Sequence, residues 1–148
     1  MYSEKIHAEV DISVSPEKVF NFLTNPKNIP LVLPGLIENY NIPELPIQVG
    51  SKFNFKYQML GIVQEGEITV NKVESNSTYD FTSTGGIASK WVQRMTEKDN
   101  GTHFALDVEY DPPKSWLDKI KLEIVRKMNQ SDAEKYVQNL KTLLEMQS

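Results

Sequence analysis

The amino-acid sequence predicts an α+β fold in which a curved antiparallel sheet of about seven strands wraps around a long C-terminal helix. Apolar and polar residues alternate over residues 6–14, short alternating segments separated by turn residues fill residues 36–110, and residues 114–148 contain neither Gly nor Pro. Alternation places apolar side chains on one face of a strand, whereas a long segment without helix breakers is typical of a helix. Residues 36–110 lack the helical spacing that a parallel βαβ unit needs, so the sheet is predicted to be antiparallel.

Length and composition indicate a single globular domain over residues 1–148. The 148 residues include 20 acidic and 16 basic side chains, a formal net charge of −4, and no Cys. The lack of Cys excludes disulfides, Cys-ligated metals and a thiol nucleophile. The negative charge argues against a nucleic-acid partner, which normally meets a basic surface. The first residues lack the apolar core of a secretory signal and no apolar stretch is long enough to span a membrane, so we expect a cytoplasmic location.

The first strand and the helix after it are marked by their boundary residues. The strand over residues 6–14 is followed by Ser15 and Pro16, which suit the N-cap and the first position of a helix. This short helix is expected to end before Pro26, with one further irregular turn before the second strand.

Turn residues divide the middle of the chain into hairpins. Gly66 interrupts a strand and predicts a bulge or bend there. The predicted turns are Leu60-Gly61, Asn76-Ser77, Gly85-Gly86 and Asp99-Asn100-Gly101.

The C-terminal segment has an apolar stripe at helical spacing. The stripe must be buried, and the apolar face of the sheet is the only partner of sufficient size, so the helix is predicted to lie across the sheet with a joint near Asn129-Gln130. The stripe consists of Leu117, Ile120, Ile124, Met128, Ala133, Tyr136, Val137, Leu140, Leu143 and Leu144.

Four segments carry a resemblance to a known superfamily. Residues Val14–Phe20, Leu33-Pro34-Gly35, Asn100–Phe104 and Asn139–Glu145 resemble motifs of the START-like (SRPBCC) superfamily, nearest to its polyketide cyclase and coenzyme-Q-binding members. The resemblance spans nearly the whole chain and implies the helix-grip fold. It implies less about function, because the superfamily includes lipid carriers, cyclases, allergen-type binders and ribosome-associated toxins.

Catalytic and metal-binding motifs are sparse. His7 and His103 lie on the polar phase of two strands expected to be neighbours, so we interpret them as solvated side chains rather than as metal ligands. Glu65 and Glu67 share one face of a strand and are expected to point outward, although a bulge at Gly66 would turn one of them inward. No catalytic residue, metal or cofactor is therefore predicted.

The aromatic residues on the inner face of the predicted sheet indicate a binding site. One helix fills a curved sheet poorly, and the remaining gap is a usual site for an apolar ligand, but a fully packed core is the alternative. Among the candidates, Trp91 is expected to contact a guest, whereas Trp116 is expected nearer the rim. The predicted ligand-binding residues are Phe55, Tyr57, Met59, Tyr79, Phe81, Trp91, Gln93, Met95, Phe104, Leu106, Leu117, Ile120, Ile124 and Met128.

The sequence thus favours binding or transport of a small hydrophobic molecule, such as a lipid, a quinone or a polyketide-like aromatic. A cyclase or dehydratase that uses the same cavity, with a Tyr or a buried carboxylate as acid or base, is one alternative. An interaction module like the toxin-type relatives is the other. A pocket carboxylate with a perturbed pKa would favour the enzyme, and an exposed apolar patch would favour the interaction module.

Overall fold

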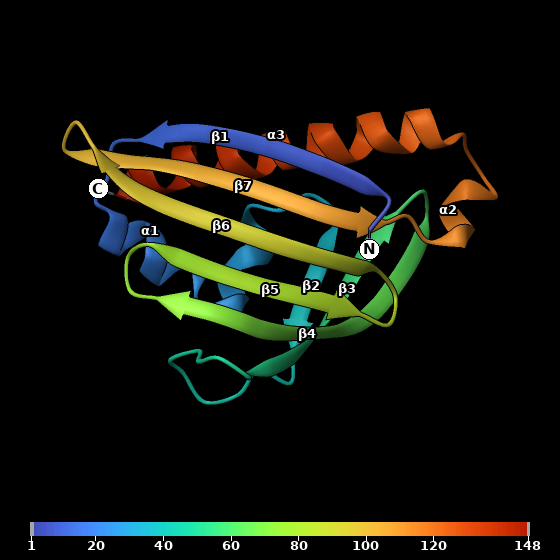
Figure 1. Ribbon diagram of the computed structural model, residues 1–148, viewed down its shortest axis with the longest axis horizontal. Coiled ribbons are helices and arrows are strands. Elements are labelled where there is room, and N and C mark those ends of the chain that lie inside the picture. The colour runs from blue at the N-terminus through green and yellow to red at the C-terminus, as the bar shows by residue number, and fades with distance from the viewer. Residues whose placement is uncertain (1, 148) are drawn as a thin grey trace.

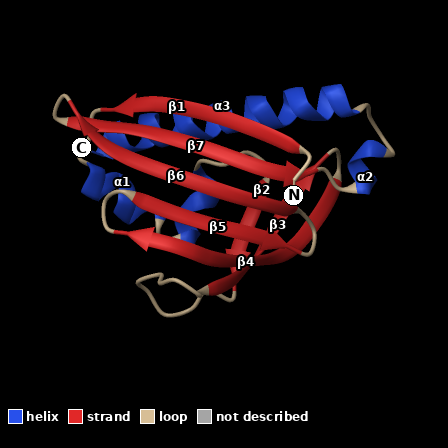
Figure 2. Ribbon diagram, viewed as in Figure 1, coloured by secondary structure: helices blue, strands red, loops and turns tan. Residues whose placement is uncertain are grey.

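The computed structural model describes residues 2–147 and contains one seven-stranded antiparallel sheet with strand order β1-β7-β6-β5-β4-β3-β2 (Figures 1 and 2). The α+β fold predicted from the sequence is confirmed. The strands are β1 (Glu4–Ile12), β2 (Leu36–Tyr40), β3 (Lys52–Met59), β4 (Ile62–Glu74), β5 (Thr78–Thr84), β6 (Ala88–Lys98) and β7 (Gly101–Asp111), and the helices are α1 (Pro16–Leu23), η1 (Pro26–Leu31), α2 (Lys114–Leu117) and α3 (Leu122–Gln147).

The sheet is curved and α3 runs along its β1 edge. Figure 1 shows β2 and β3 crossing the direction of β5, β6 and β7, while α1 lies toward the end of the molecule where α3 finishes. The core lies between the concave face of the sheet and these helices. Its most completely buried large side chains include Phe104, Leu106, Tyr136 and Leu140.

The first strand and helix follow the pattern predicted for them. In β1, Ile6, Ala8 and Ile12 are buried while the intervening polar residues face outward. The side chain of Ser15 caps α1 by accepting a hydrogen bond from the backbone N–H of Lys18. This confirms the helix start, because an N-cap oxygen satisfies one of the free amides of the first turn.

Gly66 does not form the predicted bulge. Its strand β4 pairs continuously with β3 through Phe55 opposite Gly66, and the register shift in β4 lies between Val70 and Lys72. Gly66 is instead a point of close approach, since a Cβ there would lie 2.2 Å from the carbonyl oxygen of Thr84. The strand needs Gly at this position because the β5–β6 turn crosses directly over it.

The C-terminal helix differs from the prediction in the position of its break. The chain leaves the helical conformation at residues 118–121, between α2 and α3, and is continuous through Asn129 and Gln130. This turn changes the helical phase, so the spacing counted from Leu117 does not continue into α3. Val125 and Asn129 are buried, whereas Ile124 is 40% exposed. The second half of the predicted stripe, from Ala133 to Leu144, is correctly placed, with Leu143 only partly buried.

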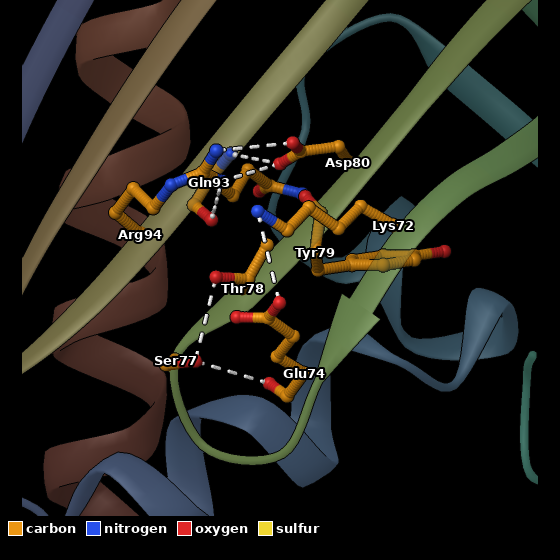
Figure 3. A network of polar contacts seen from close by, with 8 residues as sticks. All are labelled: Lys72, Glu74, Ser77, Thr78, Tyr79, Asp80, Gln93 and Arg94. Atoms are coloured by element: carbon orange, nitrogen blue, oxygen red, sulfur yellow. Dashed lines mark hydrogen bonds and ion pairs between the residues drawn. The ribbon is translucent and has the colours of Figure 1, made fainter. Parts of the chain in front are cut away.

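A polar network on the outer face fixes the alignment of β5 and β6 (Figure 3). The guanidinium of Arg94 donates to both carboxylate oxygens of Asp80, at 2.5 and 3.1 Å. Two-point pairing of this kind holds a fixed geometry. Tyr79 precedes Asp80 and Gln93 precedes Arg94, and these two neighbours lie directly opposite each other on β5 and β6. The outer network therefore also positions two side chains of the inner face.

Candidate ligand-binding cavity

A cavity of about 120 Å³ lies between the inner face of the sheet and α3. Its wall is mostly apolar and aromatic. The rings of Phe81 and Trp91 stack at a centroid distance of 5.3 Å, and Tyr136 from α3 meets Trp91 edge-on at 5.7 Å. These rings occupy preferred aromatic geometries, so they form a rigid wall that brings β5, β6 and α3 together.

Gln93 is committed to the protein and does not offer its amide to a guest. Its side-chain oxygen accepts a 2.6 Å hydrogen bond from the hydroxyl of Tyr136, and its side-chain nitrogen donates to the carbonyl oxygen of Tyr79 at 3.4 Å. Burial raises the pKa values of Tyr79 and Tyr136, so both hydroxyls stay neutral. The pair formed by Gln93 and Tyr136 therefore ties α3 to the sheet.

An ionisable pair lines the cavity where α3 meets β3. The hydroxyl of Tyr57 donates to Oδ2 of Asp132 at 3.2 Å. Burial raises the pKa of Asp132 above its ordinary value, although the hydrogen bond from Tyr57 and the charge of Lys135 act in the opposite direction. Desolvation also raises the pKa of Tyr57. A half-buried carboxylate with a raised pKa is a group suited to proton transfer.

Two other cavity-lining residues each have a buried polar atom without a hydrogen-bond partner. These atoms are the indole Nε1 of Trp116 and the side-chain oxygen Oδ1 of Asn39. Trp116 is only 2% exposed and packs with Met59 and Val125. The expectation that Trp116 lies nearer the rim is therefore wrong: both Trp side chains of the chain line the cavity.

The structure divides the residues predicted from the sequence into three groups. Six of them line the cavity, namely Phe55, Tyr57, Tyr79, Phe81, Trp91 and Gln93. Four are buried away from it: Met95, Phe104 and Leu106 in the main core and Met59 in the smaller cluster with Trp116.

The third group, from the C-terminal segment, lies outside the cavity wall. Leu117 and Ile124 are 42% and 40% exposed, and Ile120 and Met128 are partly buried against the smaller cluster. The change of helical phase at residues 118–121 explains this placement, because it turns Asn129, Asp132 and Ala133 toward the cavity instead.

The lining residues that were not predicted as ligand-binding include three with polar groups, namely Asn39, Trp116 and Asp132. Asp132 had a usable signal: Asn129, Asp132 and Tyr136 recur at spacings of three and four, which places them on one face of a helix. Asn39 had none, because a polar residue in a short strand gives no indication of which face it occupies.

The outward-facing groups lie as predicted. His7 Nδ1 lies 2.8 Å from Asp107 and His103 Nδ1 lies 2.6 Å from Asp11, on the outer face of β1 and β7. Hydrogen bonds to Glu9 and then to Asp107 raise the pKa of His7. Within residues 2–147, no cluster of His, Asp and Glu has an arrangement that would hold a metal ion.

The predicted carboxylate pair on β4 also faces away from the cavity. Glu65 is exposed and accepts a hydrogen bond from Tyr40, and Glu67 lies 3.7 Å from Lys52.

In the described part of the chain, no helix combines the length and apolar character that a membrane span needs.

Solved structures of other proteins share this fold at low sequence identity. A Thermus thermophilus protein, TTHA0849, has a TM-score of 0.79 at 15% identity, covering 98% of this chain and 99% of that one. The protein MLL2253 from Mesorhizobium loti has a TM-score of 0.72 at 22% identity, with coverage of 98% and 99%. The Zhui aromatase/cyclase from Streptomyces sp. R1128 has a TM-score of 0.75 at 10% identity, with coverage of 97% and 94%.

The amino-acid sequence was also compared with curated proteins and with models of protein families. A search among curated proteins gives no significant match. The family model described as "Polyketide cyclase / dehydrase and lipid transport" matches residues 3–145. With almost the whole chain matched and the helix-grip architecture in place, the protein belongs to this family of START-like, SRPBCC-type domains.

Proposed function

We propose that the protein binds one small, uncharged, mainly apolar molecule in the cavity between the sheet and α3. The observation that supports this most strongly is the cavity of about 120 Å³ with a rigid aromatic wall, in a family that includes cyclases and lipid transporters. Protein interiors normally pack without such voids, so an apolar space of this size supports a binding role.

The volume limits the size of the guest. An apolar cavity of roughly 150 Å³ accommodates benzene, whereas pockets for drug-sized ligands measure roughly 300–1,000 Å³. The cavity of about 120 Å³ therefore fits one aromatic ring or a short hydrocarbon group without rearrangement. A larger polycyclic molecule would enter only if α3 or the η1 segment moved.

The charges around the cavity favour an uncharged guest. The side chains that line it include one carboxylate, Asp132, and no Lys, Arg or His. A carboxylate ligand would lose its hydration without gaining a cationic partner, which is costly in an apolar site. We therefore expect neutral ring compounds to bind better than fatty acids or aromatic acids.

Isothermal titration of the full chain with acetophenone and with benzoate tests this proposal. The two compounds have similar size and differ in charge. Acetophenone should bind saturably at one site per chain, and benzoate should bind more weakly at neutral pH. Saturable binding of benzoate in preference to acetophenone, or no saturable binding of any neutral aromatic compound, would contradict the proposal.

Acid–base catalysis in the same cavity is the second candidate, and the pair formed by Tyr57 and Asp132 favours it. The raised pKa of Asp132 brings this carboxylate closer to the range in which a general base is effective. A cyclase would use Asp132 to remove a proton next to a carbonyl group, and the hydroxyl of Tyr57, which donates to Asp132 at 3.2 Å, would hold this carboxylate in place. Exchange of the methyl protons of bound acetophenone for deuterium, present in wild type and lost in Asp132→Asn, would identify this activity.

A further inference from the structure

Apolar side chains lie at the surface where the two C-terminal helices meet, at residues 114–127, here called the α2–α3 corner. Leu117 in α2 and Ile124 in the first turn of α3 are both exposed. Ile120 between them is only partly buried, against the smaller cluster that contains Trp116. A single exposed apolar residue is ordinary, but several at one corner are typical of an interaction surface.

The α2–α3 corner is basic in a chain that is acidic overall. It contains five Lys or Arg and two Asp or Glu, a net charge of +3, whereas the whole chain carries −4. The rest of the chain therefore carries −7. At physiological ionic strength, exposed charges more than about 8 Å apart are largely screened from each other, so a partner at this corner meets the local positive charge.

Two of the cations at this corner are not used by the protein itself. Lys114 and Arg126 each pair with a carboxylate. Among the described residues, by contrast, the ammonium groups of Lys121 and Lys127 have neither an ion pair nor a hydrogen bond. Lys121, Ile124 and Lys127 follow one another at intervals of three, which places one free cation on each side of the exposed Ile124.

The shape of the corner suits a flat partner. Figure 1 shows α2 and the turn after it projecting at one end of the molecule, opposite the end that holds α1. A projecting corner fits a flat, deformable surface, whereas a partner helix needs a groove. Lys side chains have long flexible stems, so apolar neighbours can enter a bilayer interface while the ammonium groups stay among the headgroups. An anionic bilayer matches both the charge and the shape.

We propose that the α2–α3 corner docks the protein on an anionic membrane surface. Leu117 and Ile124 enter the interface, and Lys121 and Lys127 contact the lipid phosphates. The inference goes beyond the proposed binding function and does not depend on it. Because Trp116 of the same short helix lines the cavity, docking brings one wall of the cavity to the membrane.

Vesicle sedimentation with the full chain tests the proposal. Vesicles of phosphatidylcholine mixed with an equal amount of phosphatidylglycerol should bind the protein at least about tenfold more tightly than pure phosphatidylcholine vesicles, since each Lys near an anionic surface contributes about fivefold. Raising NaCl from about 0.1 M to about 0.5 M should release the protein. Equal binding to both kinds of vesicle, or no binding at low salt, would contradict the proposal.

Charge variants locate the attraction. Lys121→Glu combined with Lys127→Glu should weaken binding to the anionic vesicles by about twentyfold or more. The matched control combines Lys18→Glu with Lys27→Glu, at exposed positions in α1 and η1, and makes the same change in net charge. The control should bind like wild type. If both double variants lose binding equally, the net charge and not this corner decides, and the proposal is wrong.

Apolar variants test the contact with the interface. Leu117→Gln combined with Ile124→Gln should weaken binding to the anionic vesicles by about tenfold or more, because two apolar side chains no longer leave water. The matched control, Leu31→Gln with Ile37→Gln, changes the same residue types at exposed positions in η1 and β2 and should bind like wild type. A loss in the control alone would place the docking surface elsewhere. Melting curves check that all variants fold.

An environment-sensitive label keeps the proposal testable if a double variant does not fold. The chain contains no Cys, so Leu117→Cys creates a single attachment point for a nitrobenzoxadiazole dye. Emission from this dye should move to shorter wavelength with anionic vesicles, and the same dye at Leu31→Cys should not respond. The reverse pattern would contradict the proposal. If the protein binds poly-L-glutamate but not vesicles, the corner serves an acidic protein and the proposal is wrong.

Discussion

Filling the cavity from α3 should stabilise the protein and abolish binding. Ala133 lines the cavity and is 6% exposed, so Ala133→Leu places three additional carbons in the empty space. At ~24 cal/mol per Å³, a cavity of about 120 Å³ corresponds to about 3 kcal/mol. Burying the added carbons at ~0.8 kcal/mol each gives about 2 kcal/mol. A gain of about 1–2 kcal/mol in the free energy of unfolding is therefore expected, since the fit will be imperfect.

Urea unfolding measures this effect, and Ala8→Leu provides the matched control. Ala8 is also 6% exposed but does not line the cavity, so the larger side chain should overpack the core there and cost about 1–3 kcal/mol. Ala133→Leu should raise the urea midpoint at an unchanged m-value and eliminate saturable acetophenone binding. If Ala133→Leu destabilises the protein as much as Ala8→Leu, or if binding survives, the reasoning about the cavity is wrong.

Three further predictions concern the carboxylate, the surface His residues and the helix. Asp132→Asn should be at least as stable as wild type at neutral pH. The raised pKa of Asp132 means that the folded state binds the proton more tightly than the unfolded state, so ionisation of Asp132 destabilises the folded state. This advantage should shrink as the pH falls and vanish well below pH 3.8, where Asp132 is protonated in both states, and urea midpoints at acidic and neutral pH check the sign. Changing both His7 and His103 to Ala should leave acetophenone affinity unchanged, as titration calorimetry would show, because both side chains lie on the outer face; a loss of binding would contradict that placement. Truncation after Pro113 removes both C-terminal helices and should give an aggregating chain, since burial of a single Leu is worth ~2–5 kcal/mol against a total of ~5–15; a truncated monomer that melts cooperatively would show that α3 is dispensable.

The sheet and the helix order were predictable because their signals are local and repeated. The alternation over residues 6–14 and the turn pairs Asn76-Ser77 and Gly85-Gly86 specify strand faces and hairpins without knowledge of the partner strands. Six of the predicted ligand-binding residues line the cavity because strand alternation identified the inner face correctly.

Residues on the C-terminal helices were harder to place because their orientation depends on a break with no Gly or Pro to mark it. The turn at residues 118–121 changes which side of the helix meets the sheet, so Ile124 and Met128 were predicted inward where Val125 and Asn129 are buried. The burial of Trp116 against Met59 depends on a tertiary contact between α2 and β3 that no local pattern reveals.

The location of a bound guest shows whether the cavity between the sheet and α3 is the binding site. Intermolecular NOEs can be recorded between acetophenone and the methyl groups of the full chain labelled with ¹³C at Ala and Leu. Binding in the cavity should give contacts to Ala133 and Leu36, which line it, and none to Ala8, which is buried outside it. NOEs confined to exposed methyl groups such as those of Leu31 and Leu117 would place the ligand on the surface and contradict binding in the cavity.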